Sequence, residues 1–105
     1  MKKDNNSLLE LENWYLNNCN GDWEHRCGIH VNTLDNPGWE LIIDLEDTEI
    51  EDVIFTEIDM QKNENDWMQC EVKNKQFHGY GGPTNLIEII NCFLNWAKTK
   101  KSNGS

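Results

Sequence analysis

The sequence predicts an α+β domain in which an N-terminal and a C-terminal helix pack on one face of an antiparallel sheet of about five strands. Near both ends of the chain, apolar residues recur every three or four positions, a period typical of amphipathic helices. Between these ends, apolar and polar residues alternate in short runs that are separated by Gly, Asn and Asp, as in strands joined by turns. Helices that flank a run of strands favour an arrangement in which the helices share one side of the sheet.

The first helix is expected to begin at Ser7, which can form a capping box with Glu10, and to end near Asn18. Asn20-Gly21 then stops it, because glycine adopts positive φ without steric cost. Its expected buried stripe contains Leu8, Leu11, Tyr15 and Cys19, widened by Trp14.

The next stretch predicts a long hairpin. From Trp23 to Thr33 the sequence alternates with a period of two, which predicts a strand. Its successor, Trp39 to Leu45, alternates in the same way and should turn Trp39, Leu41, Ile43 and Leu45 to one dry face. Between the two strands, Asp35-Asn36-Pro37-Gly38 predicts a turn of the type II pattern, because Pro37 sets φ for the second turn position and Gly38 supplies positive φ at the third.

Three further strands and a helix complete the predicted domain. The strands are expected at 53–62, 67–73 and about 76–80, with polar turns between them. Pro83 suits the first turn of the closing helix, and Asn85 with Glu88 offers an alternative cap. The apolar stripe of this helix contains Leu86, Ile89, Ile90, Phe93, Leu94 and Trp96/Ala97.

Length and composition predict one cytoplasmic domain. A chain of 105 residues suffices for a single core, expected over residues 7–98, with flexible tails at 1–6 and 99–105. No apolar run approaches the ~20 residues of a membrane span, and Met1 to Asn6 lack the apolar region of a signal peptide. In the cytoplasm the four cysteines should remain thiols.

The charge of the chain is strongly negative and unevenly distributed. The net charge is −10, but the body from Asp4 to Glu88 holds all 19 acids and only four bases, a net −15. Such a body repels phosphate backbones and attracts basic proteins. The densest acidic segment runs from residue 44 to 52 and contains Asp44, Glu46, Asp47, Glu49, Glu51 and Asp52. Taken alone, a charge run of this kind is usually a solvated surface that keeps the protein soluble.

Several motifs resemble the immunity protein 53 family of bacterial polymorphic toxin systems. They are G-D-W-E-H from Gly21, T-L-D-N-P-G-W from Thr33, D-W-M-Q-C from Asp66, the Phe77 and Gly79–Gly82 segment, and N-L-I-E-I-I-N-C-F-L-N-W from Asn85. The resemblance covers roughly Leu8 to Trp96; Gly82-Pro83 departs from the Asp-Pro expected before the last helix.

The resemblance implies a non-enzymatic protein that neutralises a cognate toxin domain by stoichiometric binding. Many such toxins are basic nucleases, so a basic partner would meet the acidic segment by electrostatic complementarity. We therefore expect Asp44, Glu46, Asp47, Glu49, Glu51 and Asp52 to bind the partner, with exposed aromatics as anchors. A related possibility is that the carboxylates imitate the phosphates of a nucleic acid.

An alternative function is a small hydrolase or ligand-binding module centred on Asp22, Glu24 and His25, since an acid beside a histidine can act as a general acid/base pair. Against it, Glu24 and His25 would point to opposite faces of a strand, and no nucleophile is spaced beside them. Cys19, His25, Cys27 and His30 lack the ligand spacing of structural zinc sites, and Gly79–Gly82 lacks the lysine of a phosphate loop. We expect neither a catalytic residue, nor a metal, nor a cofactor.

Overall fold

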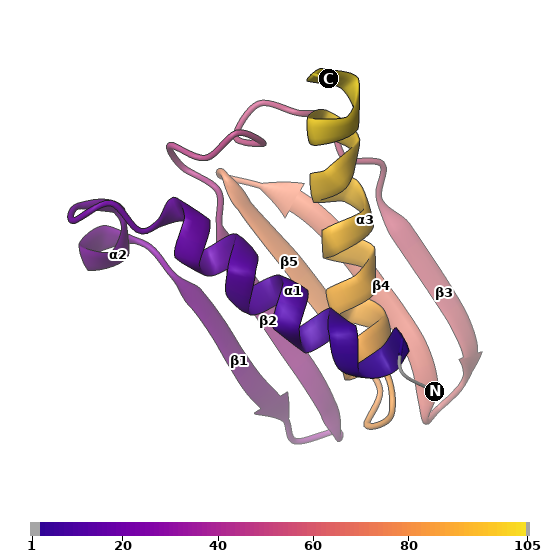
Figure 1. Ribbon diagram of the computed structural model, residues 1–105. Coiled ribbons are helices and arrows are strands. Elements are labelled where there is room, and N and C mark those ends of the chain that lie inside the picture. The colour runs from indigo at the N-terminus through magenta and orange to yellow at the C-terminus, as the bar shows by residue number, and fades with distance from the viewer. Residues whose placement is uncertain (1–2, 105) are drawn as a thin grey trace.

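The computed structural model describes residues 3–104, which form three helices and five strands (Figure 1). In chain order these are α1 (Lys3–Asn18), α2 (Trp23–Arg26), β1 (Ile29–Leu34), β2 (Gly38–Asp44), β3 (Ile58–Asn63), β4 (Asp66–Lys73), β5 (Gln76–Gly81) and α3 (Leu86–Gly104). No helix among these residues is long and apolar enough to cross a membrane.

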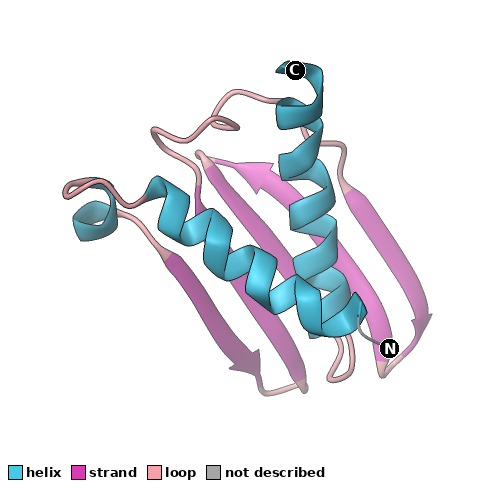
Figure 2. Ribbon diagram, viewed as in Figure 1, coloured by secondary structure: helices cyan, strands magenta, loops and turns pink. Residues whose placement is uncertain are grey.

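The strands form one open sheet in the order β1-β2-β5-β4-β3, and every neighbouring pair is antiparallel. Both long helices lie across the same face of this sheet, and within the described part of the chain the other face has no helix on it (Figure 2). The α+β architecture predicted from the sequence is therefore confirmed.

The core lies between this sheet and α3. Leu41 and Ile43 of β2 and Phe77 of β5 are fully buried against Ile89 and Phe93 of α3. The rings of Phe77 and Phe93 meet at a centroid distance of 5.2 Å. Close approach of α3 to β5 requires glycine, because a Cβ at Gly79 would overlap the Cγ2 atom of Ile89. The predicted dry face of β2 is thus confirmed, and the glycines of β5 serve packing.

The first helix begins earlier than predicted, and its buried stripe is rotated. Ser7 lies inside α1, where its hydroxyl donates to the side-chain oxygen of Asn91 on α3, so the predicted capping box is wrong. Leu11 is buried and Trp14 is partly buried, whereas the side chains of Leu8 and Tyr15 are exposed. The cause is that α1 packs mainly on α3, and a three-and-four spacing cannot show which stripe will face that helix.

The strand predicted from Trp23 is wrong in its first part. Trp23–Arg26 is a single helical turn, and β1 starts only at Ile29. The carboxylate of Glu24 accepts hydrogen bonds from the N–H groups of Asn20 and Gly21, at 2.9 and 2.8 Å. The Asn20 side chain accepts from the N–H groups of Asp22 and Trp23. These local bonds stabilise a turn in place of a strand.

The type II turn predicted at residues 35–38 is also wrong. The Asn36–Pro37 peptide bond is cis, and Gly38 does not adopt positive φ. Gly38 instead opens β2, at a position where a Cβ would overlap the carbonyl oxygen of Gly81 on β5. Glycine is required there by the close approach of two strands.

The third strand is shorter than predicted, since residues 45–57 form a loop that leads to β3 on the far side of the sheet. Ile54, which falls within the predicted strand, lies in this loop and is 87 % exposed. Ile50 of this loop is buried, while Val53 and Phe55 pack against the core without strand pairing. Beyond Asp44, which ends β2, the acidic segment therefore lies in a loop and not at an edge of the sheet.

The remaining elements agree closely with the prediction. β4, β5 and the apolar stripe of α3 are confirmed. Asn85, which was predicted to cap the closing helix together with Glu88, directly precedes α3, is buried and donates a hydrogen bond to Glu88 Oε1 at 2.6 Å. Pro83, which was expected in the first turn of this helix, lies outside it. Flexible tails were expected at 1–6 and 99–105, but α1 and α3 extend into part of both ranges. Residues 1, 2 and 105 lie outside the described residues. The predicted bounds of the domain, 7–98, stay a prediction.

Candidate functional site

The acidic segment, residues 44–52, is tied to the body of the protein by two tryptophans. The indole N–H of Trp23 donates to the carbonyl oxygen of Glu46 at 2.9 Å, and the indole N–H of Trp96 donates to that of Ile54, just beyond the segment, at 2.9 Å. Within the segment, Leu45 and Ile50 are buried. The carboxylates thus project from a backbone that is fixed by buried contacts.

Asp44 differs from the other acids of the segment because both of its carboxylate oxygens are engaged. One accepts from the backbone N–H of Gly28 at 2.9 Å, and the other accepts from the side-chain amide of Gln76 at 2.8 Å. The side chain therefore joins the ends of β1, β2 and β5. Its position indicates a structural task alongside the predicted binding role.

Ion pairs engage three more of the predicted binding residues. Arg26 of α2 lies 2.9 Å from Asp47 and 3.9 Å from Glu46, and it also pairs with Asp22 at 3.0 Å. The hydrogen bonds to Asp47 and Asp22 raise the pKa of Arg26, so it stays charged.

The third of these residues is Glu51, which pairs with Lys75 Nζ at 2.7 Å; this contact raises the pKa of the lysine. Among the described residues, no ion pair engages Glu49 or Asp52, and both are exposed. These two carboxylates are the ones most open to a partner.

Asp22, Glu24 and His25 do not assemble into a catalytic group. Asp22 is held by Arg26, and the carboxylate of Glu24 is occupied by backbone N–H groups. Hydrogen bonds from its own N–H and from those of Asn20 and Gly21 lower the pKa of Glu24, against the opposing effect of burial. Within residues 3–104, no hydrogen bond joins His25 to either acid.

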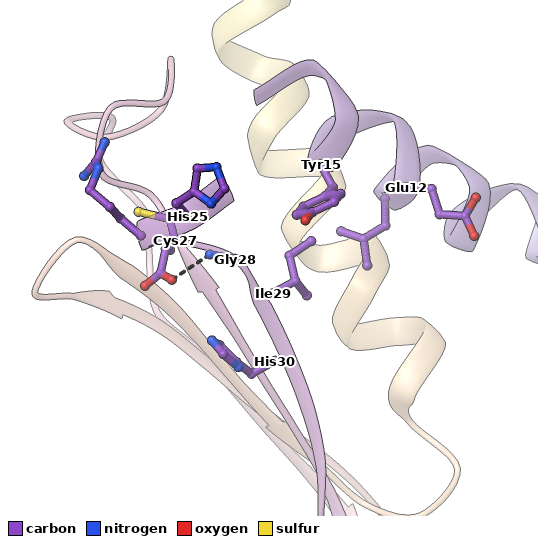
Figure 3. Close-up of a pocket in the computed structure, with 10 residues that line it drawn as sticks. Glu12, Tyr15, His25, Cys27, Gly28, Ile29 and His30 are labelled. Carbon is purple, nitrogen blue, oxygen red and sulfur yellow. Dashed lines mark hydrogen bonds between the residues drawn. The ribbon is translucent and has the colours of Figure 1, made fainter. Parts of the chain in front are cut away.

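His25 lies at the rim of a pocket of about 520 Å³ between α1, α2 and β1 (Figure 3). Tyr15 comes from α1, Cys27 follows α2, and Ile29 and His30 belong to β1. Burial is the main cause of a raised pKa at Cys27, which disfavours its thiolate. The part of the chain that the structure describes contains no group of three or more His, Cys, Asp or Glu side chains that could hold a metal ion.

A further group of polar and aromatic residues, which the sequence analysis missed, lies on the face of the sheet opposite the helices. Because side chains alternate along a strand, residues next to the buried Leu41, Phe77 and Gly79 point to this uncovered side, which we call the open face. One row of directly paired residues crosses all five strands: Asn32, Glu40, Tyr80, Gln69 and Asp59. The adjacent row contains His30, Ile42, His78 and Glu71.

Tyr80 is at the centre of the open face. Its ring is nearly parallel to that of His78, at 21° and a centroid distance of 6.5 Å. Burial raises the pKa of Tyr80, and the charges of Glu40 and Glu71 add to the shift. Nε2 of His78 is buried with no hydrogen-bond partner among the described residues. The alternation of Phe77 and Gly79 with His78 and Tyr80, within the strand predicted at about 76–80, was the available signal.

Comparison with known proteins places this chain in a family. The sequence model described as immunity protein 53 matches residues 8–98, which is most of the chain. The protein therefore belongs to the immunity protein 53 family, as the resemblance of its motifs had implied. No match was found among curated proteins or among solved structures.

Proposed function

We propose that this immunity protein acts in the cytoplasm, where it binds a basic toxin domain stoichiometrically and neutralises it without catalysing a reaction. Family membership supports the existence of a toxin partner. The net charge of −10 supports the basic character of that partner, since opposite charges accelerate association. The same charge disfavours nucleic acid as a partner.

The observation that carries this proposal is the rigid attachment of an acidic loop. We propose that the partner contacts Asp44, Glu46, Asp47, Glu49, Glu51 and Asp52. Their backbone is held by Trp23 and Trp96, so binding would not incur the entropy cost of ordering a flexible loop. Arg26 and Lys75 form ion pairs with some of the six residues but, among the described residues, not with Glu49 or Asp52. The charges of Glu49 and Asp52 would therefore attract the partner from a distance.

The experiment measures binding of the toxin domain encoded beside this protein, together with protection of cells that express it. The variant E49Q/D52N removes two exposed charges without breaking any ion pair of the described residues. The matched control E12Q/E64Q removes two other exposed charges. Both variants retain Asp44, whose loss would disturb the ends of three strands.

The expected result is that E49Q/D52N associates about tenfold more slowly at low salt, with a weaker dependence on ionic strength, while the control changes little. Equal association rates for the two variants would show that the acidic segment is not the docking surface. Absence of wild-type binding at every ionic strength, or turnover of a small molecule that depends on His25, would overturn the proposed function itself.

A further inference from the structure

The open face offers a second surface, and its chemistry differs from that of the acidic segment. No helix of residues 3–104 covers it (Figure 2), and its central residue, Tyr80 of β5, is an aromatic ring between carboxylates of the two strands that flank β5. Glu40 is paired directly with Tyr80 across β2 and β5, and Glu71 is paired with His78 across β4 and β5. Both carboxylates are close enough to Tyr80 to raise the pKa of its hydroxyl.

These two carboxylates are only weakly satisfied within the protein. Glu40 accepts one long hydrogen bond, 3.3 Å from the side-chain amide of Asn32. Glu71 lies 3.8 Å from Lys73 Nζ, and both side chains are partly solvated. Exposed pairs at such distances contribute little to stability. Their charges thus remain largely available to an external cation.

A hollow of about 240 Å³ adjoins Tyr80 on this face. Glu57, Asp59 and Glu71 line it together with Gln69, and no lysine or arginine does. Small-molecule sites usually have volumes of about 300–1,000 Å³, so this hollow is better matched to one long side chain of a protein partner. The three carboxylates determine that this side chain should be basic.

An arginine side chain suits the hollow beside Tyr80 better than a lysine side chain does. Its planar guanidinium stacks on an aromatic ring and can bond a carboxylate through two parallel N–H groups. It is also more weakly hydrated than an ammonium group, so its burial at an interface costs less. Tyrosine and arginine are, moreover, both enriched among the energetic anchors of protein interfaces.

We propose that the open face receives an arginine of the toxin domain in the hollow beside Tyr80, where Asp59 and Glu71 line the hollow and Glu40 flanks the tyrosine from β2, and that this contact anchors the complex. This proposal rests on the proposed function, because the partner is the same toxin. It assigns separate tasks to the two surfaces: the acidic segment accelerates association, and the open face slows dissociation. Charges at the rim of an interface mainly change association rates, whereas desolvated pairs at its centre change dissociation rates.

The test compares full-length variants by surface-based kinetics with the toxin domain encoded beside this protein. E40Q/E71Q removes two charges from the open face and is matched by E49Q/D52N, which removes two from the acidic segment. Tyr80→Leu removes the aromatic face and is matched by Tyr80→Phe, which keeps it. Denaturant unfolding of each variant verifies that the fold is retained.

The expected result is that E40Q/E71Q and Tyr80→Leu dissociate about tenfold faster or more, while Tyr80→Phe dissociates like the wild type and E49Q/D52N changes the association rate alone. If the wild type binds and both open-face variants dissociate at the wild-type rate, the anchor is wrong and the proposed function stands. A change confined to the association rate of E40Q/E71Q would equally overturn the anchor. If the wild type does not bind, the proposed function fails first, and the anchor fails with it.

Discussion

The indole N–H of Trp23 donates a hydrogen bond to the carbonyl oxygen of Glu46 at 2.9 Å and so connects α2 to the acidic segment. The two residues are separated by 23 positions in the sequence. Trp23 is almost completely buried, and its ring contacts those of Trp14 and Tyr15 on α1. A core aromatic residue therefore positions a charged loop.

We predict that Trp23→Ala lowers the free energy of unfolding by about 3–5 kcal/mol, because it removes a buried indole and leaves a cavity. Trp23→Phe should cost less, about 1–3 kcal/mol, mainly because the carbonyl of Glu46 loses its donor. Urea unfolding measures both losses, and hydrogen exchange of the amides at 46–52 should accelerate in the Phe variant. Unchanged exchange there would show that Trp23 does not hold the segment.

The contact between Gly79 and Ile89 gives a second prediction. Gly79→Ala should lower the free energy of unfolding by about 1–3 kcal/mol, because the added Cβ would overlap Ile89 Cγ2 and push α3 away from β5. The matched control is Gly28→Ala, since a Cβ there meets no atom within 4 Å.

A double-mutant cycle with Ile89→Ala identifies the cause of this loss. The cost of Gly79→Ala should be smaller in the Ile89→Ala background, where the overlapping atom is absent. Equal costs in both backgrounds would mean that the overlap with Ile89 is not the source of the destabilisation.

The lowered pKa of Glu24 predicts a pH dependence of stability. Because the folded-state pKa lies below its ordinary value of 4.5, the carboxylate stabilises the fold above that value and loses this contribution as pH falls through the folded pKa. Glu24→Gln should therefore be less stable than the wild type at pH 7, and the difference should shrink at acidic pH. Urea unfolding from pH 7 to pH 3 measures it; a difference independent of pH would contradict an electrostatic origin.

The thiols should differ in reactivity. The hydrogen bond with Cys92 and burial raise the pKa of Cys70, which suppresses its reactive thiolate, and its side chain is 2 % exposed. We predict that iodoacetamide at pH 8 modifies Cys70 last of the four cysteines in the native protein. In urea all four should react at similar rates, and rapid native modification of Cys70 would contradict the buried position.

Prediction from the sequence succeeded where one local pattern had one structural solution. The dry face of β2 could be identified because strict alternation admits only one inward set, Leu41 and Ile43. The buried stripe of α1 could not be identified in this way, because Leu8 and Ser7 lie three and four positions before Leu11 and both fit a helical stripe that contains it. At Trp23 a clear alternation was overruled by hydrogen bonds that the side chains of Asn20 and Glu24 accept from backbone N–H groups.

By itself, the sequence determined the α+β class, the family and the excess of negative charge, since these follow from periodicity, motif and composition. Only the tertiary structure decided which carboxylates are free. Arg26, Lys75 and the N–H of Gly28 reach the acidic segment from other elements, and their distances exist only after folding. Likewise, Glu40, Tyr80 and Glu71 come from three strands, and sheet pairing alone brings them to one surface.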